Sequence, residues 1–128
     1  MANQLNANVL NVGAVNYVSQ WSFDATTTLI RRRRHYQQRF STASYNDYRN
    51  IWSTIARDIQ RIDNFTVKGS QCKNKWNKLV RGYVNLKRIR SGNPHRFPIE
   101  SPNSYDERFF GELSDEFWEV YRSNYLFI

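Results

Sequence analysis

Residues 48–59 carry an apolar pattern whose period fits an α-helix and no other regular structure. Spacings of three and four place these side chains on one stripe of a helix, whereas a strand would divide them between two faces. The apolar positions are Tyr48, Ile51, Trp52, Ile55 and Ile59. A stripe this regular has to be buried against other elements. The polar residues 41–44 separate this helix from the preceding one, and Asn46 or Asp47 is its predicted N-cap.

Two further amphipathic helices are predicted on either side of this one. The first follows Trp21, with Ser22 as its cap, and the third starts near Ser70. The apolar stripe of the third helix contains Cys72, Trp76, Leu79, Tyr83 and Leu86. Each of the three helices carries a tryptophan. We expect Trp21, Trp52 and Trp76 to form the structural core rather than platforms for stacked bases.

The two ends of the chain differ from this central part. Residues 1–20 are rich in Asn, uncharged and predicted to form a loose arm. Residues 91–104 contain all three prolines and are predicted to form a loop. Residues 105–128 are predicted to form a fourth amphipathic helix and an apolar tail. The polar face of this helix is acidic, so it should point away from any polyanionic ligand. Two arrangements of the C-terminal aromatic residues stay open: they pack on the core, or they pair two copies into a homodimer.

Charge is segregated along the chain. The 128 residues contain 19 Lys and Arg against 11 Asp and Glu, a formal net charge of +8. Residues 66–92 hold eight Lys and Arg and no acid, whereas residues 105–119 hold six acids and one Arg. A solvated surface normally mixes the two signs, so an acid-free basic helix indicates a polyanionic partner. The side of this helix opposite its apolar stripe offers only Lys, Arg and Asn, the residue types that contact phosphate, guanine and adenine.

Residues 31–34 are four consecutive arginines in the first predicted helix. At 100° per residue they wrap its whole circumference, so all four cannot face one ligand. Three mutually compatible interpretations stay open: a solvated face whose stems lie over the core, phosphate contacts, or a nuclear import signal. Phosphate contacts are assigned to Arg32 and Arg33.

No residue pattern indicates catalysis, a metal or another cofactor. Cys72, the single cysteine, lies on an apolar stripe, and with only two histidines it cannot complete a four-ligand zinc site. Asp115 and Glu119 have the spacing of an exposed acidic face. No glycine-rich phosphate loop is present, and no apolar run reaches the roughly 20 residues that span a bilayer. We therefore expect a soluble intracellular protein without enzyme activity, small-molecule substrate or membrane association.

The tryptophan register, the string QCKNKWNKL at residues 71–79 and the Phe-Phe-x-x-Leu pattern at residues 109–113 resemble the Myb/SANT-like fold, and more narrowly its trihelix group. The similarity covers residues 21–113. It implies an all-α, three-helix helix-turn-helix bundle over residues 21–90 with an additional C-terminal helix. It also implies a nuclear transcription regulator that binds double-stranded DNA sequence-specifically through a recognition helix in the major groove.

The resemblance also implies roles within the third helix. Lys73, Asn74 and Asn77 correspond to positions that reach base edges, and Lys78 and Arg81 continue the same face. Phosphate contacts are expected from further residues on or near this helix, namely Lys68, Ser70, Lys75 and Arg88.

The start of the third helix departs from the family pattern. Family members usually begin this helix with a Thr or Ser cap three residues before the glutamine, where this chain has Lys68 and Gly69. Ser70 or Thr66 is therefore the predicted cap.

Two other functions stay open. SANT-like modules of the same fold bind histone tails or other chromatin partners, although such modules tend to carry acids on the third helix. Myb-like domains also occur in DNA-binding accessory proteins of mobile elements, which sequence alone does not separate from transcription factors.

Overall fold

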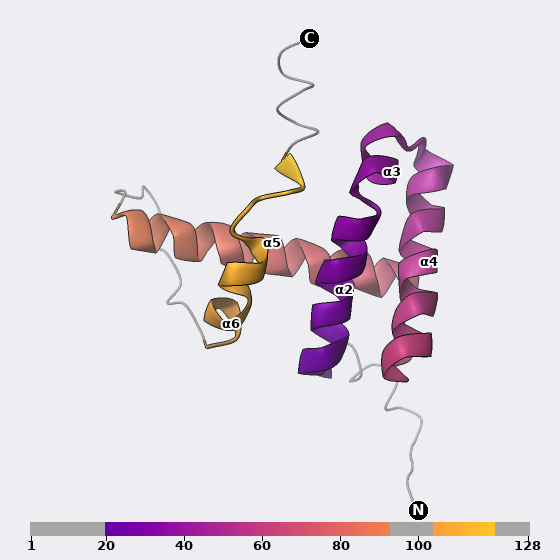
Figure 1. Cartoon of the computed structure of the whole chain (residues 1–128), viewed down its shortest axis with the longest axis horizontal. Coiled ribbons are helices and arrows are strands. Elements are labelled where there is room, and N and C mark those ends of the chain that lie inside the picture. The colour runs from indigo at the N-terminus through magenta and orange to yellow at the C-terminus, as the bar shows by residue number, and fades with distance from the viewer. Residues whose placement is uncertain (1–19, 93–103, 120–128) are drawn as a thin grey trace, which may run out of the picture.

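The computed structural model describes residues 20–92 and 104–119, which fold into five helices without any strand (Figure 1). This confirms the all-α prediction. The predicted arm, most of the proline-containing loop and the last nine residues lie outside the described residues. The helices are α2 (Phe23–His35), α3 (Gln37–Thr42), α4 (Tyr45–Asp63), α5 (Gly69–Ser91) and α6 (Ser104–Leu113).

The helices form a bundle in which α5 is the longest element and lies across the others. Helices α2 and α4 run side by side in opposite directions, joined through the short α3, and α5 crosses both of them (Figure 1). The first half of α5 packs on α4, and its second half extends beyond that pair to pack on α6. The long third helix is thus supported at two places by separate parts of the chain.

One apolar core joins these elements. Trp21, Trp52 and Trp76 are 7%, 3% and 5% exposed and lie within this core. Phe40 packs its ring 5.0 Å from that of Trp52 and so connects α3 to α4. Full burial of one large apolar side chain contributes about 1.5 to 3 kcal/mol, so the tryptophans supply much of the driving force for folding.

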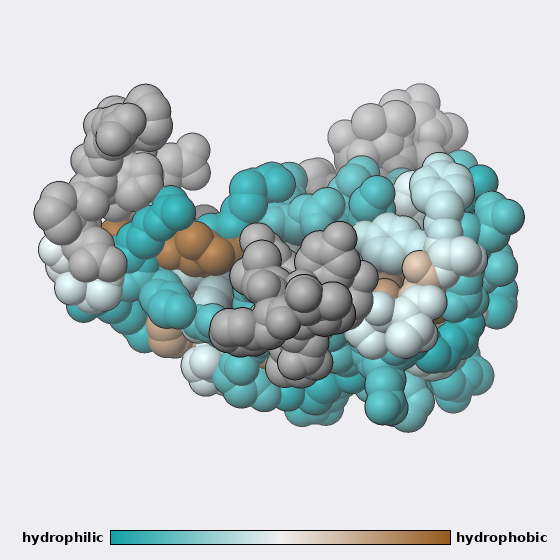
Figure 2. Space-filling view, turned by 90° about the horizontal axis from the view of Figure 1, so that it is seen from above, coloured by the Kyte–Doolittle hydropathy of each residue, from teal (hydrophilic) through white to brown (hydrophobic). Residues whose placement is uncertain are grey.

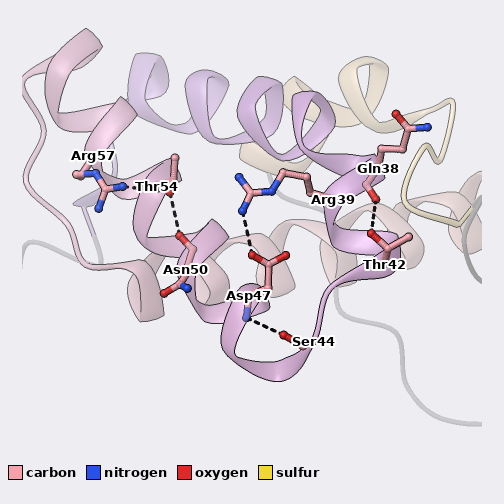
Figure 3. Close-up of polar contacts among 8 residues, drawn as sticks. All are labelled: Gln38, Arg39, Thr42, Ser44, Asp47, Asn50, Thr54 and Arg57. Atoms are coloured by element: carbon pink, nitrogen blue, oxygen red, sulfur yellow. Dashed lines mark hydrogen bonds and ion pairs between the residues drawn. The ribbon is translucent and has the colours of Figure 1, made fainter.

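Serine hydroxyls cap the first two long helices. The Ser22 Oγ accepts the N–H of Ala25 at 3.0 Å, which confirms the predicted cap of α2. In α4 the prediction of Asn46 or Asp47 was wrong, because Ser44 is the N-cap and its Oγ accepts the Asp47 N–H at 3.2 Å (Figure 3). The Asp47 carboxylate lies in the first turn of α4 and forms an ion pair there with Arg39.

The start of α5 also differs from the prediction. Lys68 is the N-cap residue, so the prediction of Ser70 or Thr66 was wrong. The Gln71 side chain accepts the Lys68 N–H at 2.9 Å and satisfies this backbone donor. Thr66 instead donates its hydroxyl to the Gln60 side chain at 2.7 Å.

Gly69 allows α5 to begin directly against α4. A Cβ built on Gly69 would come 2.9 Å from the Ser53 backbone nitrogen and 3.0 Å from the Trp52 carbonyl carbon. Real Cβ atoms essentially never come within 3.0 Å of another residue's backbone, so a side chain at this position would force the two helices apart. The glycine therefore sets how closely the two helices approach each other at this crossing.

The C-terminal region does not form the single continuous helix that the apolar spacing predicts. Helix α6 ends at Leu113, and Glu116 has a left-handed backbone with φ of 51°. The turn directs Phe117 and Trp118 onto Trp76, with ring centroids 5.7 and 5.5 Å away. These two C-terminal aromatic residues therefore pack on the core; those after residue 119 lie outside the described residues.

The acidic residues of this turn contact basic residues of the bundle. Asp115 pairs with Arg34 of α2, and Glu116 pairs with Lys87 of α5 and accepts the Tyr83 hydroxyl. These ionic hydrogen bonds hold the pKa of both carboxyl groups below their usual values.

Candidate nucleic-acid interface

The outward side of α5 presents polar and basic side chains without an acid. Asn74, Asn77 and Arg81 are exposed on this side, and Lys73 and Lys78 are exposed with them. Residues 66–92 contain no Asp or Glu, so nothing on this helix neutralises its cations internally. The structure therefore brings together all five residues that the sequence assigned to base contacts.

The opposite side of α5 fixes the orientation of these polar residues. Cys72 is fully buried, and burial raises the pKa of its thiol to about 12, so the thiol stays protonated and unreactive at neutral pH. Leu79 and Tyr83 are 5% and 4% exposed on the same stripe. Because this stripe is held by the core on α2, α4 and α6, rotation of α5 about its axis is prevented, and Asn74 and Asn77 keep facing outward.

The residues assigned to phosphate contacts on α5 lie in different environments. Lys68, Ser70 and Arg88 are exposed. Lys75 is half-buried on the flank of the helix. Lys73 places its Nζ 5.5 Å from the centroid of the Tyr48 ring, so it connects the edge of α5 to α4.

The arginine run of α2 is largely occupied by contacts within the domain. Arg32 forms an ion pair with Asp58 of α4 at 3.5 Å. Arg34 binds the carboxylate of Asp115 and donates a second hydrogen bond to the Glu112 carbonyl at 2.9 Å. Arg31 is exposed. The run therefore divides into individual side chains with separate partners, as expected for residues that wrap around a helix.

Arg33 is the member of this run that lies deepest. Its guanidinium carbon is 4.0 Å from the centroid of the Phe40 ring and 5.3 Å from that of Trp76, and it donates a hydrogen bond to Gln37. Burial lowers the pKa of Arg33 to about 10, which leaves the side chain charged at neutral pH. A guanidinium held against two aromatic rings contributes cation–π and packing energy. Its contacts lie inside the domain rather than on the outward side of α5.

Two arginines of α4 that sequence reasoning did not assign to DNA flank the start of α5. Arg49 and Arg57 lie four residues before and after Ser53, so the three share one stripe of the helix. Ser53 is the residue that Gly69 approaches, which places this stripe beside the first turn of α5. All three are exposed. The spacing is visible in the sequence, but only the helix crossing shows that the stripe adjoins α5.

Two of the three acids of α4 form ion pairs with arginines. Asp47 pairs with Arg39 of α3, and Asp58 pairs with Arg32 of α2 and with Arg61. Arg57 donates a hydrogen bond to the Thr54 hydroxyl of its own helix at 3.2 Å (Figure 3). The carboxylates of Asp47 and Asp58 are therefore engaged by Arg39 of α3 and Arg32 of α2.

Neither a metal site nor a membrane span is found in the part of the chain that the structure describes. Residues 20–92 and 104–119 contain no group of three or more His, Cys, Asp or Glu side chains placed to hold a metal ion. None of the described helices is both long and apolar enough to cross a membrane.

A helix braced by two others, with an exposed acid-free basic side, defines the class of helix-turn-helix DNA-binding domains. A sequence model of the Myb/SANT-like DNA-binding domain family matches residues 19–119, and the chain belongs to this family. Neither the curated proteins nor the solved structures compared with the chain gave a significant match. Family membership supports DNA binding as the general activity, points to a non-enzymatic role and suggests a nuclear location.

Proposed function

We propose that this chain binds double-stranded DNA sequence-specifically by placing α5 in the major groove, and that it acts in the nucleus as a transcription regulator of the trihelix type without catalytic activity. The observation that carries the proposal is the outward side of α5. Five exposed Lys, Arg and Asn side chains lie there on a helix that the core holds in one orientation, and the helix itself contains no acid.

The residue types on this side suit base recognition. Asn74 and Asn77 each offer an amide that donates to and accepts from adenine, and Arg81 offers a fork that fits guanine O6 and N7. Lys73 and Lys78 flank the amides and reach either a base edge or a phosphate. We assign these five residues to base readout.

Phosphate contacts surround this row of residues. On α5 we assign them to Lys68, Ser70, Lys75 and Arg88. On α4 we add Arg49 and Arg57, because their stripe adjoins the start of α5. Arg32 shares its charge with Asp58, so any phosphate contact it makes is weaker, and Arg33 acts by packing against Phe40 and Trp76.

Selection of randomised duplex DNA on the purified chain, at about 150 mM salt so that bare electrostatic attraction is partly screened, tests the proposal. A sharp motif is expected, and its symmetry also tests the homodimer: two half-sites indicate two copies, and a single short site indicates one. Enrichment without a motif would overturn sequence-specific binding, and histone tails would then be the partners to examine.

The salt dependence of binding gives a second, quantitative test. If about five phosphates are neutralised, log affinity against log salt should have a slope of about −4 to −5. Replacing Arg49 by Ala should reduce this slope by about one and weaken binding to selected and random DNA alike. Arg61→Ala is the matched control, because the Arg61 side chain already pairs with Asp58. A slope near zero for the native chain contradicts DNA binding altogether.

A further inference from the structure

A groove opens beside the recognition side of α5. It has a volume of about 510 Å³ and lies where α3, the middle of α5 and the C-terminal turn meet. Grooves of roughly 300 to 1,000 Å³ are the size that proteins use to bind ligands and anchor side chains. On the face seen from above, one apolar patch lies between hydrophilic flanks (Figure 2).

Aromatic and branched side chains line most of this groove. Phe40 and Trp76 are 9% and 5% exposed, and Trp118 is 9% exposed. Val80 and Val84 of α5 are half-buried along the same wall. These surfaces are fixed by the core behind them, so the groove is formed before any ligand arrives and accepts a bulky apolar side chain without rearrangement.

Positive charge surrounds the apolar lining. Arg33 and Arg81 both line the groove, and Lys73 lies against Tyr48, another lining residue. Glu119 is the one acid among the lining residues. The partner that complements this site carries negative charge around an apolar anchor, which an acidic peptide with one large apolar side chain provides.

We infer that this groove is a docking site for an acidic peptide segment of a partner protein, with an aromatic or leucine side chain as its anchor. The site shares Asn77 and Arg81 with the row of residues assigned to base readout. A bound peptide and a bound DNA duplex would therefore compete for these two side chains, and each would lower the affinity for the other by the same factor. The competition rests on the proposed function, whereas the docking does not.

The test uses the full chain and a fluorescent peptide of about twelve residues in which Trp and Leu stand among Asp and Glu. Fluorescence anisotropy should show binding with a Kd of about 10 to 100 µM, the range of transient contacts. Two comparison peptides serve as controls. One keeps the Asp and Glu residues but lacks Trp and Leu, and the other keeps Trp and Leu but lacks the acids. Equal binding by the acids-only peptide would reduce the effect to general charge attraction and overturn the inference.

Filling the groove provides a matched pair of variants. Ser41 of α3 lines the groove, whereas its exposed neighbour Thr42 does not (Figure 3 shows Thr42 at the end of α3). Ser41→Trp should weaken peptide binding about tenfold or more, about 1.4 kcal/mol, and Thr42→Trp should leave it unchanged. Thermal unfolding of both variants checks that the fold is kept. Equal effects of the two variants would contradict the site.

A gain of affinity gives a test that loss of folding cannot imitate. Glu119→Lys removes the one acid of the lining and should strengthen binding of the acidic peptide severalfold. Weaker binding by this variant would overturn the assigned charge of the partner. Peptide titrations without DNA come first, so that they decide the docking even if the chain fails to bind DNA. Titrations with a duplex then decide the competition.

Discussion

The arginine run of α2 and the outward side of α5 have similar composition and opposite surroundings. Arg33 lies against Phe40 and Trp76, and Arg34 is bound by Asp115. On α5, Asn77 and Arg81 are exposed on a helix that contains no acid. Density of positive charge along a sequence is therefore a poor guide to a binding surface. What separates the two regions is whether folding brings acids and aromatic rings to the cations.

Residues that pack in the core and residues that bind DNA should differ most in how much their substitution lowers the free energy of unfolding. The largest such difference is expected at two neighbouring positions of α5. Trp76→Ala should lower the free energy of unfolding by about 3 to 5 kcal/mol, because a large buried ring leaves a cavity. Asn77→Ala, one residue further on, should leave the free energy of unfolding unchanged within about 0.5 kcal/mol, because its side chain is exposed. Urea denaturation followed by tryptophan fluorescence measures both.

Arg33 gives the next largest effect, and a direct test of its assignment to packing. Arg33→Ala should lower the free energy of unfolding by about 2 to 3 kcal/mol through lost packing and cation–π contacts. The variant should still bind DNA normally at temperatures where it is folded. Arg81→Ala is the reverse control, with native stability and weaker DNA binding. If Arg33→Ala were as stable as the native chain but bound DNA more weakly, Arg33 would belong to the binding surface.

Base readout is expected to show as a loss confined to the preferred sequence. Asn74→Ala and Asn77→Ala should each cost about 1 to 3 kcal/mol on the selected site and little on random DNA. Competition binding with both duplexes measures the two values for each variant. Equal losses on both duplexes would mean that the amides act through charge or shape alone.

The smallest effect on stability is expected from the ion pairs that Asp115 and Glu116 form with α2 and α5. The pKa values of Asp115 and Glu116 are lowered in the fold, by hydrogen bonds from Arg34 and from Lys87 respectively. Both carboxylates therefore stabilise the fold above the unfolded pKa of about 4, and this stability is lost as the pH falls through the lower folded values. Because Arg34 and Asp115 are largely exposed, solvent screening limits each pair to about 0.2 to 1 kcal/mol.

Comparison of unfolding at about pH 6 and pH 3 checks this prediction. The double variant Asp115→Asn with Glu116→Gln should lose less stability between the two pH values than the native chain does. An unchanged pH dependence in that variant would show that other carboxyl groups control acid unfolding.

The helices were predictable where one residue pattern determined the outcome. The apolar stripe through Ile51, Ile55 and Ile59 predicted α4, because this spacing places the three side chains on one face only if the segment is an α-helix. The cap of α4 was missed because Ser44 stands beside two other good capping residues. Sequence preference ranks such neighbours as nearly equal.

The parts that sequence reasoning missed depend on contacts between distant elements. The apolar spacing after Leu113 continues, yet the helix ends there, because Glu116 adopts a left-handed backbone and binds Lys87 and Tyr83. In the same way, Arg33 is held inside the domain by the rings of Phe40 and Trp76, which lie on other elements. Local pattern predicts which elements form, and tertiary contacts determine which side chains remain available to a ligand.

The close contact at Gly69 has a consequence for protein engineering. Exchanging recognition helices between related domains is an obvious way to alter which DNA sequence is read. In the binding mode proposed above, how far a grafted helix reaches into the major groove of DNA would depend on the glycine at its first residue. Any side chain at that position would push the helix outward from Ser53. A transplanted helix should therefore keep the glycine, even though that residue recognises no base itself.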